Sequence, residues 1–236
     1  MEFQRAPLRF GEIVRPSSWS TPMNASVEFL VSASSRTLFG LRTCDLGWNA
    51  ALALAEGLIS LRGNRTTLAF VDERTALRQV VDALYRDQLS RRLLLPGGNG
   101  ILGRLANALR AKPARVRFSA STFVPALLTF LEKGCRIGIA SEDTARTAAL
   151  RSHFARHAPW HDIVTINADD DIVQRCDLII VDAANPAAER RMERRLSSVP
   201  AGLVVMAGSG LSGFIEDAPV RVGAKVPSMP AKASFA

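Results

Sequence analysis

Short apolar runs alternate with longer amphipathic stretches along the chain from Leu38 onward. The apolar runs have the length of β-strands, and we predict strands at 38–41, 67–71, 93–95, 136–140, 163–166, 178–181 and 203–206. The stretches between them have helical length and spacing of apolar positions. We predict helices there, at 46–61, 74–88, 99–111, 121–133, 142–157, 169–175 and 185–197.

This alternation indicates the fold class. Strands of about five residues that alternate with helices of about 10–15 residues are typical of βαβ units. Such units build a parallel sheet that is covered by helices on both faces. We therefore predict an α/β fold, Rossmann-like, with a mostly parallel sheet.

The two ends of the chain lack this periodicity. Residues 1–36 are rich in Pro, Ser and Arg and predict an N-terminal extension that is largely irregular. Residues 218–236 carry Pro, Ala and Lys without an apolar period and predict a disordered tail. The α/β domain is expected between them, at 37–217.

The basic balance of the chain needs an explanation. Its 30 basic and 22 acidic residues give a net charge of +8, and all but four of the basic residues are Arg. A nucleic-acid surface would interleave clustered basic residues with aromatic ones, but the arginines are scattered and Tyr85 is the single tyrosine. The densest group, Arg190 to Arg195, contains Glu193 and predicts a solvated helix face. We expect no nucleic-acid partner, and attraction to anionic lipid or phosphate stays open.

Neither a secretory route nor a metal site is indicated. There is no apolar run of about 18 residues, and the N-terminus lacks a signal-like apolar segment. The three cysteines form no CxxC pair. His153, His157 and His161 are spaced four apart, but Pro159 interrupts the helix they would need. We expect a cytoplasmic protein without a bound metal or cofactor.

In a parallel α/β fold, ligands bind in the loops that follow the carboxyl ends of the strands. The predicted junctions of this kind are 69–74, 96–100, 140–144, 181–186 and 207–210. Two of them are rich in glycine, which lets the backbone approach a phosphate at a helix N-terminus. By pattern alone each of these two is also compatible with an ordinary tight turn.

Taken in order, these segments resemble the WecG/TagA/CpsF glycosyltransferase family. The resemblance covers residues 38–217 and lies in seven segments: LFGLR at 38–42, LAFVD at 68–72, LLPGGNG at 94–100, RFSASTFVPALL at 117–128, EKGCRI at 132–137, DLIIV at 177–181 with NPAAE at 185–189, and VPAGLVV at 199–205.

The resemblance implies transfer of a sugar from a UDP-linked donor to a polyprenyl-diphosphate-linked acceptor, with inversion and without a metal. Such enzymes build bacterial surface polysaccharides at the inner face of the plasma membrane. It therefore implies a nucleotide-sugar, a lipid-linked acceptor and peripheral membrane association. A homo-oligomer or a partner glycosyltransferase also fits this role.

The chain departs from the family pattern at several polar positions. Gly97 stands where the family has its catalytic Asp, and glycine cannot accept a proton. Ala69 and Val71 stand near the family Thr and Asn, and the family diglycine is Ser141-Glu142. Glu142 and Asp143 would repel a diphosphate there and favour a helix start.

These departures predict a divergent glycosyltransferase-family protein of surface polysaccharide biosynthesis whose catalysis is impaired. Asp72 is the candidate for a relocated base. The candidate substrate-binding residues implied by the resemblance are Gly98, Asn99, Arg117, Ser121, Ser141, Pro186, Glu189 and Gly210. The alternatives are an active hexosyl or N-acetylhexosaminyl transferase with relocated catalytic residues, and a non-enzymatic protein that binds an anionic ligand.

Overall fold

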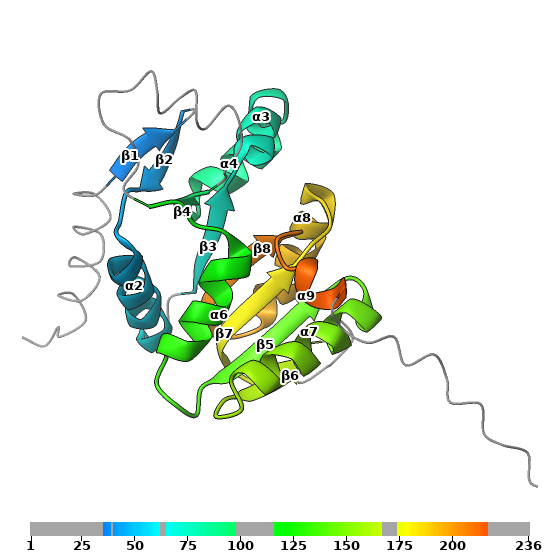
Figure 1. Cartoon of the computed structure of the whole chain (residues 1–236). Helices are drawn as coiled ribbons and strands as arrows, with labels where there is room; N and C mark the ends of the chain where they lie inside the picture. The colour runs from blue at the N-terminus through cyan, green and yellow to red at the C-terminus, as the bar shows by residue number, and fades with distance from the viewer. Residues whose placement is uncertain (1–34, 39, 62–64, 98–115, 167–173, 217–236) are drawn as a thin grey trace, which may run out of the picture. The chain divides into compact units, whose positions relative to one another are not determined.

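Six parallel strands form the central sheet of the protein (Figure 1). The fold is described from a computed structural model, which covers residues 35–38, 40–61, 65–97, 116–166 and 174–216. The strands are β3 (Thr66–Val71), β4 (Leu93–Pro96), β5 (Arg136–Ser141), β6 (Asp162–Thr165), β7 (Cys176–Asp182) and β8 (Ala201–Gly208). Their order in the sheet is β4-β3-β8-β7-β5-β6. The predicted α/β class is confirmed, and every pairing within this sheet is parallel.

Helices cover both faces of this sheet (Figure 1). One face carries α2 (Trp48–Ser60), α6 (Ala120–Phe130) and α7 (Thr144–His157), and the short α9 (Gly213–Glu216) packs against α7. The other face carries α3 (Glu73–Val81), α4 (Ala83–Ser90), α8 (Pro186–Arg195) and the 3₁₀ turn η1 (Leu196–Ser198). Parallel strands are joined by right-handed crossovers, so the direction of a connection along the sheet decides which face its helix covers. The connections β3-to-β4 and β7-to-β8 run in one direction and β5-to-β6 runs in the other, which puts their helices on opposite faces.

The central strands form the core because helices bury them on both sides. Every residue of β8 from Ala201 to Ala207 is buried, as is all of β7 except Asp177. Leu178 pairs with Leu203, and Leu68 pairs with Val205 on the other side of β8. A continuous apolar run of this kind is what a parallel strand needs when both of its faces are covered.

The first predicted strand, 38–41, is wrong. The chain instead forms an antiparallel hairpin of β1 (Ser35–Leu38) and β2 (Leu41–Cys44). Gly40 lies in the turn with φ +82°, a left-handed conformation that glycine adopts without strain. The hairpin also draws Ser35 and Arg36 into a strand, although the extension was expected to run to residue 36.

The predicted helix at 74–88 is two helices. Asp82 has extended backbone dihedrals, and its carboxylate accepts a hydrogen bond from the Tyr85 N–H at 3.0 Å, which starts α4. A side chain that caps a new helix competes with continuation of the old one. The predicted helix at 99–111, residues 1–34 of the extension and the tail at 218–236 lie outside the described residues. Of the predicted helix at 169–175 only residues 174 and 175 are described, and they are not helical.

The topology opens a crevice at the carboxyl end of the sheet. After β3 the chain passes to the face of α3, α4 and α8, whereas after β8 it passes to α9 on the face of α7. Neighbouring loops that part to opposite faces leave a space between them, and ligands of open α/β sheets bind there. Within the described ranges, no helix has both the length and the apolar character that crossing a bilayer requires.

Candidate functional site

A cavity of about 1110 Å³ occupies this crevice. Its walls come from the carboxyl ends of four neighbouring strands, β4, β3, β8 and β7, and from the helices that follow three of them. Each of the four strands contributes to the lining: Phe70 lies in β3, Gly97 follows β4, Met206 lies in β8 and Asn185 follows β7. The predicted junctions 69–74, 181–186 and 207–210 therefore meet in one place.

The N-caps of four helices line this cavity. One is Asp82 of α4, in the break between α3 and α4. The other three are Asp72 of α3, Ser119 of α6 and Asn185 of α8. Each side chain accepts a hydrogen bond from a backbone N–H of its own helix: Asp72 from Thr75 at 2.8 Å, Ser119 from Thr122 at 3.3 Å and Asn185 from Ala188 at 2.9 Å. The positive ends of three helix dipoles therefore face one space, an arrangement that favours anions.

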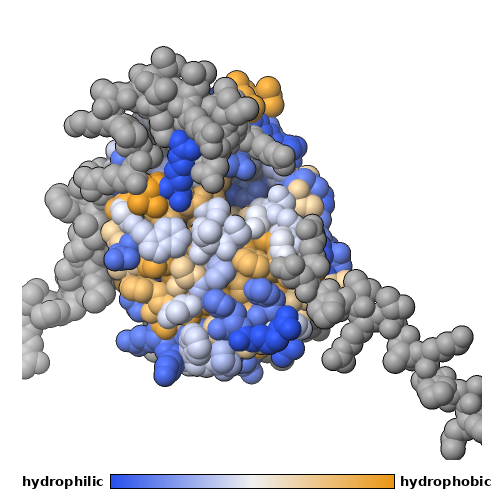
Figure 2. Space-filling view, viewed as in Figure 1, coloured by the Kyte–Doolittle hydropathy of each residue, from blue (hydrophilic) through white to orange (hydrophobic). Residues whose placement is uncertain are grey.

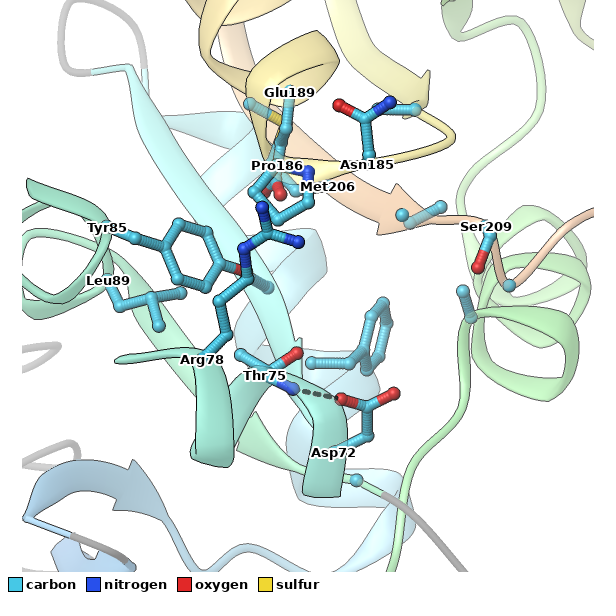
Figure 3. Close-up of a pocket in the computed structure, with 18 of the residues that line it drawn as sticks. Asp72, Thr75, Arg78, Tyr85, Leu89, Asn185, Pro186, Glu189, Met206 and Ser209 are labelled. Atoms are coloured by element: carbon cyan, nitrogen blue, oxygen red, sulfur yellow. Dashed lines mark hydrogen bonds between the residues drawn. The ribbon is translucent and has the colours of Figure 1, made fainter. Parts of the chain in front are cut away.

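A glycine-containing turn after β8 forms the wall opposite α3. Gly208 has φ +57°, and Ser209 follows it at the cavity surface (Figure 3). Gly210 packs against the start of α6 so closely that a Cβ on it would lie 2.9 Å from the Cβ of Ala120. Gly210, a predicted binding residue, thus lines the cavity through its backbone and holds the turn next to the α6 N-terminus.

Arg78 and Tyr85 supply the polar part of the wall made by α3 and α4. The Arg78 side chain extends from α3 toward the start of α8 (Figure 3). Tyr85 is buried, and its hydroxyl is hydrogen-bonded to the Thr75 side chain. Burial raises the pKa of Tyr85 to about 12, so the hydroxyl stays protonated at neutral pH. Sequence reasoning missed both residues, because they lie inside a predicted helix and not at a strand-to-helix junction.

Two of the three carboxylates in the lining are held by arginines. Glu189 pairs with the buried Arg92, and Asp82 pairs with Arg190 at 3.2 Å. The pKa of Asp82 is lowered, first by the hydrogen bond from the Tyr85 N–H and to a smaller extent by Arg190. Glu189, predicted to bind substrate, therefore lines the cavity but has its charge compensated from behind.

Asp72 is the third carboxylate. One oxygen accepts the Thr75 N–H, and the carboxylate is directed into the cavity (Figure 3). It is the candidate base proposed from the sequence, and the structure places it at the carboxyl end of β3. A carboxylate here can accept a proton from a ligand hydroxyl while its other oxygen keeps the helix cap.

The remaining predicted binding residues divide into three groups. Pro186 lines the cavity as the first residue of α8, a position that suits proline because its missing N–H would be unpaired there. Arg117, Ser121 and Ser141 do not line the cavity. Ser121 is exposed and lies near its neighbour Ser119, with the two hydroxyls 3.0 Å apart. Gly98 and Asn99 lie outside the described residues.

The predicted electrostatic obstacle at Glu142 and Asp143 is not part of this cavity. Glu142 forms two hydrogen bonds with Arg191, at 2.6 and 2.9 Å, and these lower the pKa of Glu142. Asp143, not Ser141, is the N-cap of α7 and accepts hydrogen bonds from Ala145 and Arg146. Neither carboxylate lines the cavity, so the repulsion of a diphosphate that we expect from them is not exerted from the cavity wall. The Arg191 contact also shows that an α8 arginine pairs with a carboxylate outside α8, in the loop between β5 and α7.

The described His, Cys, Asp and Glu side chains do not gather into a metal site. Among the described residues no cluster of three His, Cys, Asp or Glu side chains is placed to hold one. His153 stacks on Phe214 with ring centroids 4.6 Å apart, and the His161 ring lies 2.8 Å from the Leu128 carbonyl oxygen. His157 Nε2 lies 3.1 Å from the Pro125 carbonyl oxygen, so each of the three histidines has its own contact.

A buried carboxylate beside the cavity gives a prediction about pH. Asp182 ends β7 directly before the cavity residues Ala183 and Ala184, and its Oδ2 lies 2.8 Å from Arg146. Burial raises the pKa of Asp182, and Arg146 opposes this only in part. A raised carboxyl pKa contributes stability that is present at low pH and is lost as pH rises through the folded-state pKa.

We expect the Asp182→Asn variant to gain stability relative to the wild type as pH rises from about 4, near the unfolded-state pKa, to 7. Urea unfolding at several pH values measures this difference. Glu142→Gln is the matched control with the opposite sign. The Glu142 pKa is lowered from 4.5, so the wild type loses stability relative to this variant as pH falls below that value. A wild-type-minus-Asp182→Asn difference that stays constant with pH would contradict the prediction.

The chain was also compared with known proteins. No family model matches it, and no curated protein matches it in sequence, so the resemblance to the WecG/TagA/CpsF family stays a prediction.

Proposed function

We propose that the cavity binds a phosphorylated ligand of the nucleotide-sugar class. The chain would then be a divergent glycosyltransferase-family protein of bacterial surface polysaccharide biosynthesis whose catalysis is impaired. The observation that carries the binding proposal is the convergence of Arg78 and the N-caps of α3, α6 and α8 on one cavity. The family assignment rests on the order of the sequence segments.

The phosphate is expected on the α6 and α8 side of the cavity. The Asp72 carboxylate already occupies the N-terminus of α3 and would repel a second anion there. Ser119, Asn185 and Ser209 present polar groups on the other side, where the two remaining dipoles act. Arg78 reaches toward the start of α8 and can donate charge-assisted hydrogen bonds to a phosphate (Figure 3).

An apolar floor suits the rest of such a ligand. Phe70 and Phe118 line the cavity, and Phe118 is stacked on Trp48 with ring centroids 5.4 Å apart. Phe123 meets both Phe70 and Phe118 edge to face. Phe118 is 1 % exposed and belongs, with Phe123, to a rigid aromatic cluster behind Phe70, whose half-buried ring gives an apolar surface for a sugar or a base.

The packing around Gly97 supports impaired catalysis. A Cβ at this position would lie 3.2 Å from the carbonyl oxygens of both Phe118 and Val71, which is tighter than ordinary contact. The Gly97 N–H donates to the Val71 carbonyl at 2.9 Å, so the two backbones are locked together. An acidic side chain therefore has little room where the family resemblance would place the catalytic Asp.

The second candidate function is an active transferase with Asp72 as base. The direction of its carboxylate into the cavity favours this alternative (Figure 3). In both versions the acceptor is a polyprenyl-diphosphate-linked sugar, and the protein acts at the inner face of the plasma membrane. These two points come from the resemblance and are proposals of the same kind.

Binding is tested with UDP and UDP-sugars. We expect millimolar UDP to raise the melting temperature, because a ligand that binds only the folded state stabilises it. Arg78→Gln should weaken binding roughly 10–100-fold, since a hydrogen bond to a charged group contributes about 1.5–3 kcal/mol. Arg86→Gln, on α4 outside the cavity lining, is the matched control. The absence of any shift with UDP would remove the proposal.

Turnover separates the two versions of the function. The purified chain is incubated with a panel of UDP-sugars and a short lipid-diphosphate acceptor. Ligand binding without turnover supports the impaired protein. Turnover that Asp72→Asn lowers by about 10²–10⁴ supports the active one, because Asn keeps the helix cap and cannot accept the proton. Binding that falls steeply with salt and shows no preference for UDP points to a general anion binder.

A further inference from the structure

The apolar stripe on α3 and α4 is exposed. Leu77, Val80 and Val81 of α3 follow the spacing i, i+3, i+4, which places them on one side of that helix. Leu84 lies in the first turn of α4, just beyond the break at Asp82. Their exposed fractions are 60, 70, 84 and 76 %. They are four of the six exposed large apolar residues in the described part of the chain. Strongly hydrophobic side chains stand out over the end of α3 in Figure 2.

The stripe does not serve the fold. The opposite side of α3 turns Gln79, 3 % exposed, toward the interior, and α4 buries Tyr85 and Leu89. A helix that is used only for packing buries its apolar side and exposes its polar side. Here the polar Gln79 is buried while Leu77, Val80 and Val81 are exposed, so the apolar residues of α3 are available to something outside the described part of the chain.

The charges beside the stripe are positive on balance, because the exposed Asp87 of α4 is paired with Arg91, which follows that helix. Arg78 and Arg86 are exposed on the same two helices. Asp82, which lies between α3 and α4, caps α4 and is paired with Arg190 of the neighbouring helix α8. The acidic group closest to the stripe in sequence is therefore compensated, while two arginines flank the apolar residues.

We propose that this stripe docks the protein onto the surface of an anionic lipid bilayer. Apolar side chains that enter the headgroup region, surrounded by basic ones, are how interfacial helices bind anionic membranes. A second copy of the chain fits less well, because a two-fold contact through the stripe would bring Arg78 and Arg86 toward their own copies. Four side chains on two short helices also offer far less than the roughly 800 Å² per partner of a standard interface.

Docking through the stripe has a consequence for the cavity. Leu77, Val80 and Val81 also lie in its lining, at the wall formed by α3. A bilayer bound to the stripe would therefore lie beside the entrance to the ligand site. The inference rests on the proposed function only for its membrane location, and the residues that carry it are independent of the ligand.

Vesicle flotation with the full chain tests the docking surface. We expect binding to vesicles of phosphatidylcholine with phosphatidylglycerol, weaker binding to phosphatidylcholine alone, and a decrease with salt. Leu84→Glu should lower affinity for the anionic vesicles roughly tenfold or more, because it removes an inserted side chain and adds a repelled charge. The Val80→Ser/Val81→Ser double variant should do the same. Phe130→Ser, which changes an exposed apolar residue of α6, should bind like the wild type.

Several outcomes would overturn the inference. One is that the wild type does not bind anionic vesicles. Another is that the wild type and both stripe variants bind equally. A third is a dimer in size-exclusion chromatography that only the stripe variants lose. Far-UV circular dichroism and melting temperature check that the variants fold. Leu84 lies outside the cavity lining, so Leu84→Glu should keep the UDP shift of the wild type. Vesicle binding without a UDP shift would remove the proposed function and leave the docking surface standing.

Discussion

Replacing Arg92 by Met is expected to lower the free energy of unfolding by about 3–5 kcal/mol. The Arg92 side chain is 1 % exposed and bridges two carboxylates of α8, Glu189 and Glu193. Burial alone would lower the pKa of Arg92, but the two glutamates outweigh burial and raise it. Methionine fills a similar space without the charge, so the variant leaves the buried Glu189 carboxylate uncompensated. Urea unfolding at pH 7 measures the effect.

Two matched variants make the Arg92 result interpretable. Arg91 is the adjacent residue, and its side chain is 77 % exposed and paired with an exposed Asp87. Arg91→Met should change stability little, because exposed ion pairs are weak. The Arg92→Met/Glu189→Met double variant should recover much of the loss, since it removes the uncompensated carboxylate as well. A loss below about 1 kcal/mol for Arg92→Met would show that Glu189 finds other compensation.

The second large effect is expected at Gly202 in β8. A Cβ on this residue would lie 2.5 Å from the carbonyl oxygen of Ile59 and 3.1 Å from that of Asp177. Both are backbone atoms, one of α2 and one of β7, so no side-chain rotation relieves the overlap. Gly202→Ala must move α2 away from the sheet. We expect a loss of about 3 kcal/mol, at the upper end of the usual range for overpacking.

Gly57 of α2, the helix that Gly202 contacts, provides a control with the opposite expected effect on stability. A Cβ there would meet nothing within 4 Å, and the residue lies inside α2. Gly57→Ala should therefore raise stability by about 0.5–1 kcal/mol, because alanine loses less backbone entropy in a helix. Urea unfolding of both variants separates the effect of steric contact on stability from the effect of helix propensity. Similar effects of the two substitutions would contradict the packing explanation.

Much of the fold could be predicted from the sequence. The six strands of the parallel sheet coincide with predicted runs to within two residues at every end, for example Cys176–Asp182 against 178–181. This works because buried parallel strands consist almost wholly of apolar residues, as in β7. The hairpin at Gly40 and the helix break at Asp82 were missed because each depends on one residue's backbone dihedrals within an otherwise regular pattern.

The candidate site was predictable only at the strand-to-helix junctions and the first helical turns that follow them. Asp72, Pro186, Glu189 and Gly210 follow strands and are brought to one cavity, as the general rule for α/β folds leads one to expect. Ser141 also ends a strand, but β5 lies beyond β7 in the sheet and Ser141 does not line the cavity. Strand order depends on packing between distant segments, so sequence alone did not separate these two cases.

The sequence by itself determined the α/β class, the set of parallel strands and the junctions where a ligand could bind. These are local properties, because run length, apolar period and helix caps are read over a few residues. The tertiary structure decided which junctions meet, that Arg92 compensates Glu189 across 97 positions, and that α3 turns its apolar stripe outward. Each of these depends on neighbours that only folding brings together, and the same periodicity that predicts a buried helix face fits an exposed one equally well.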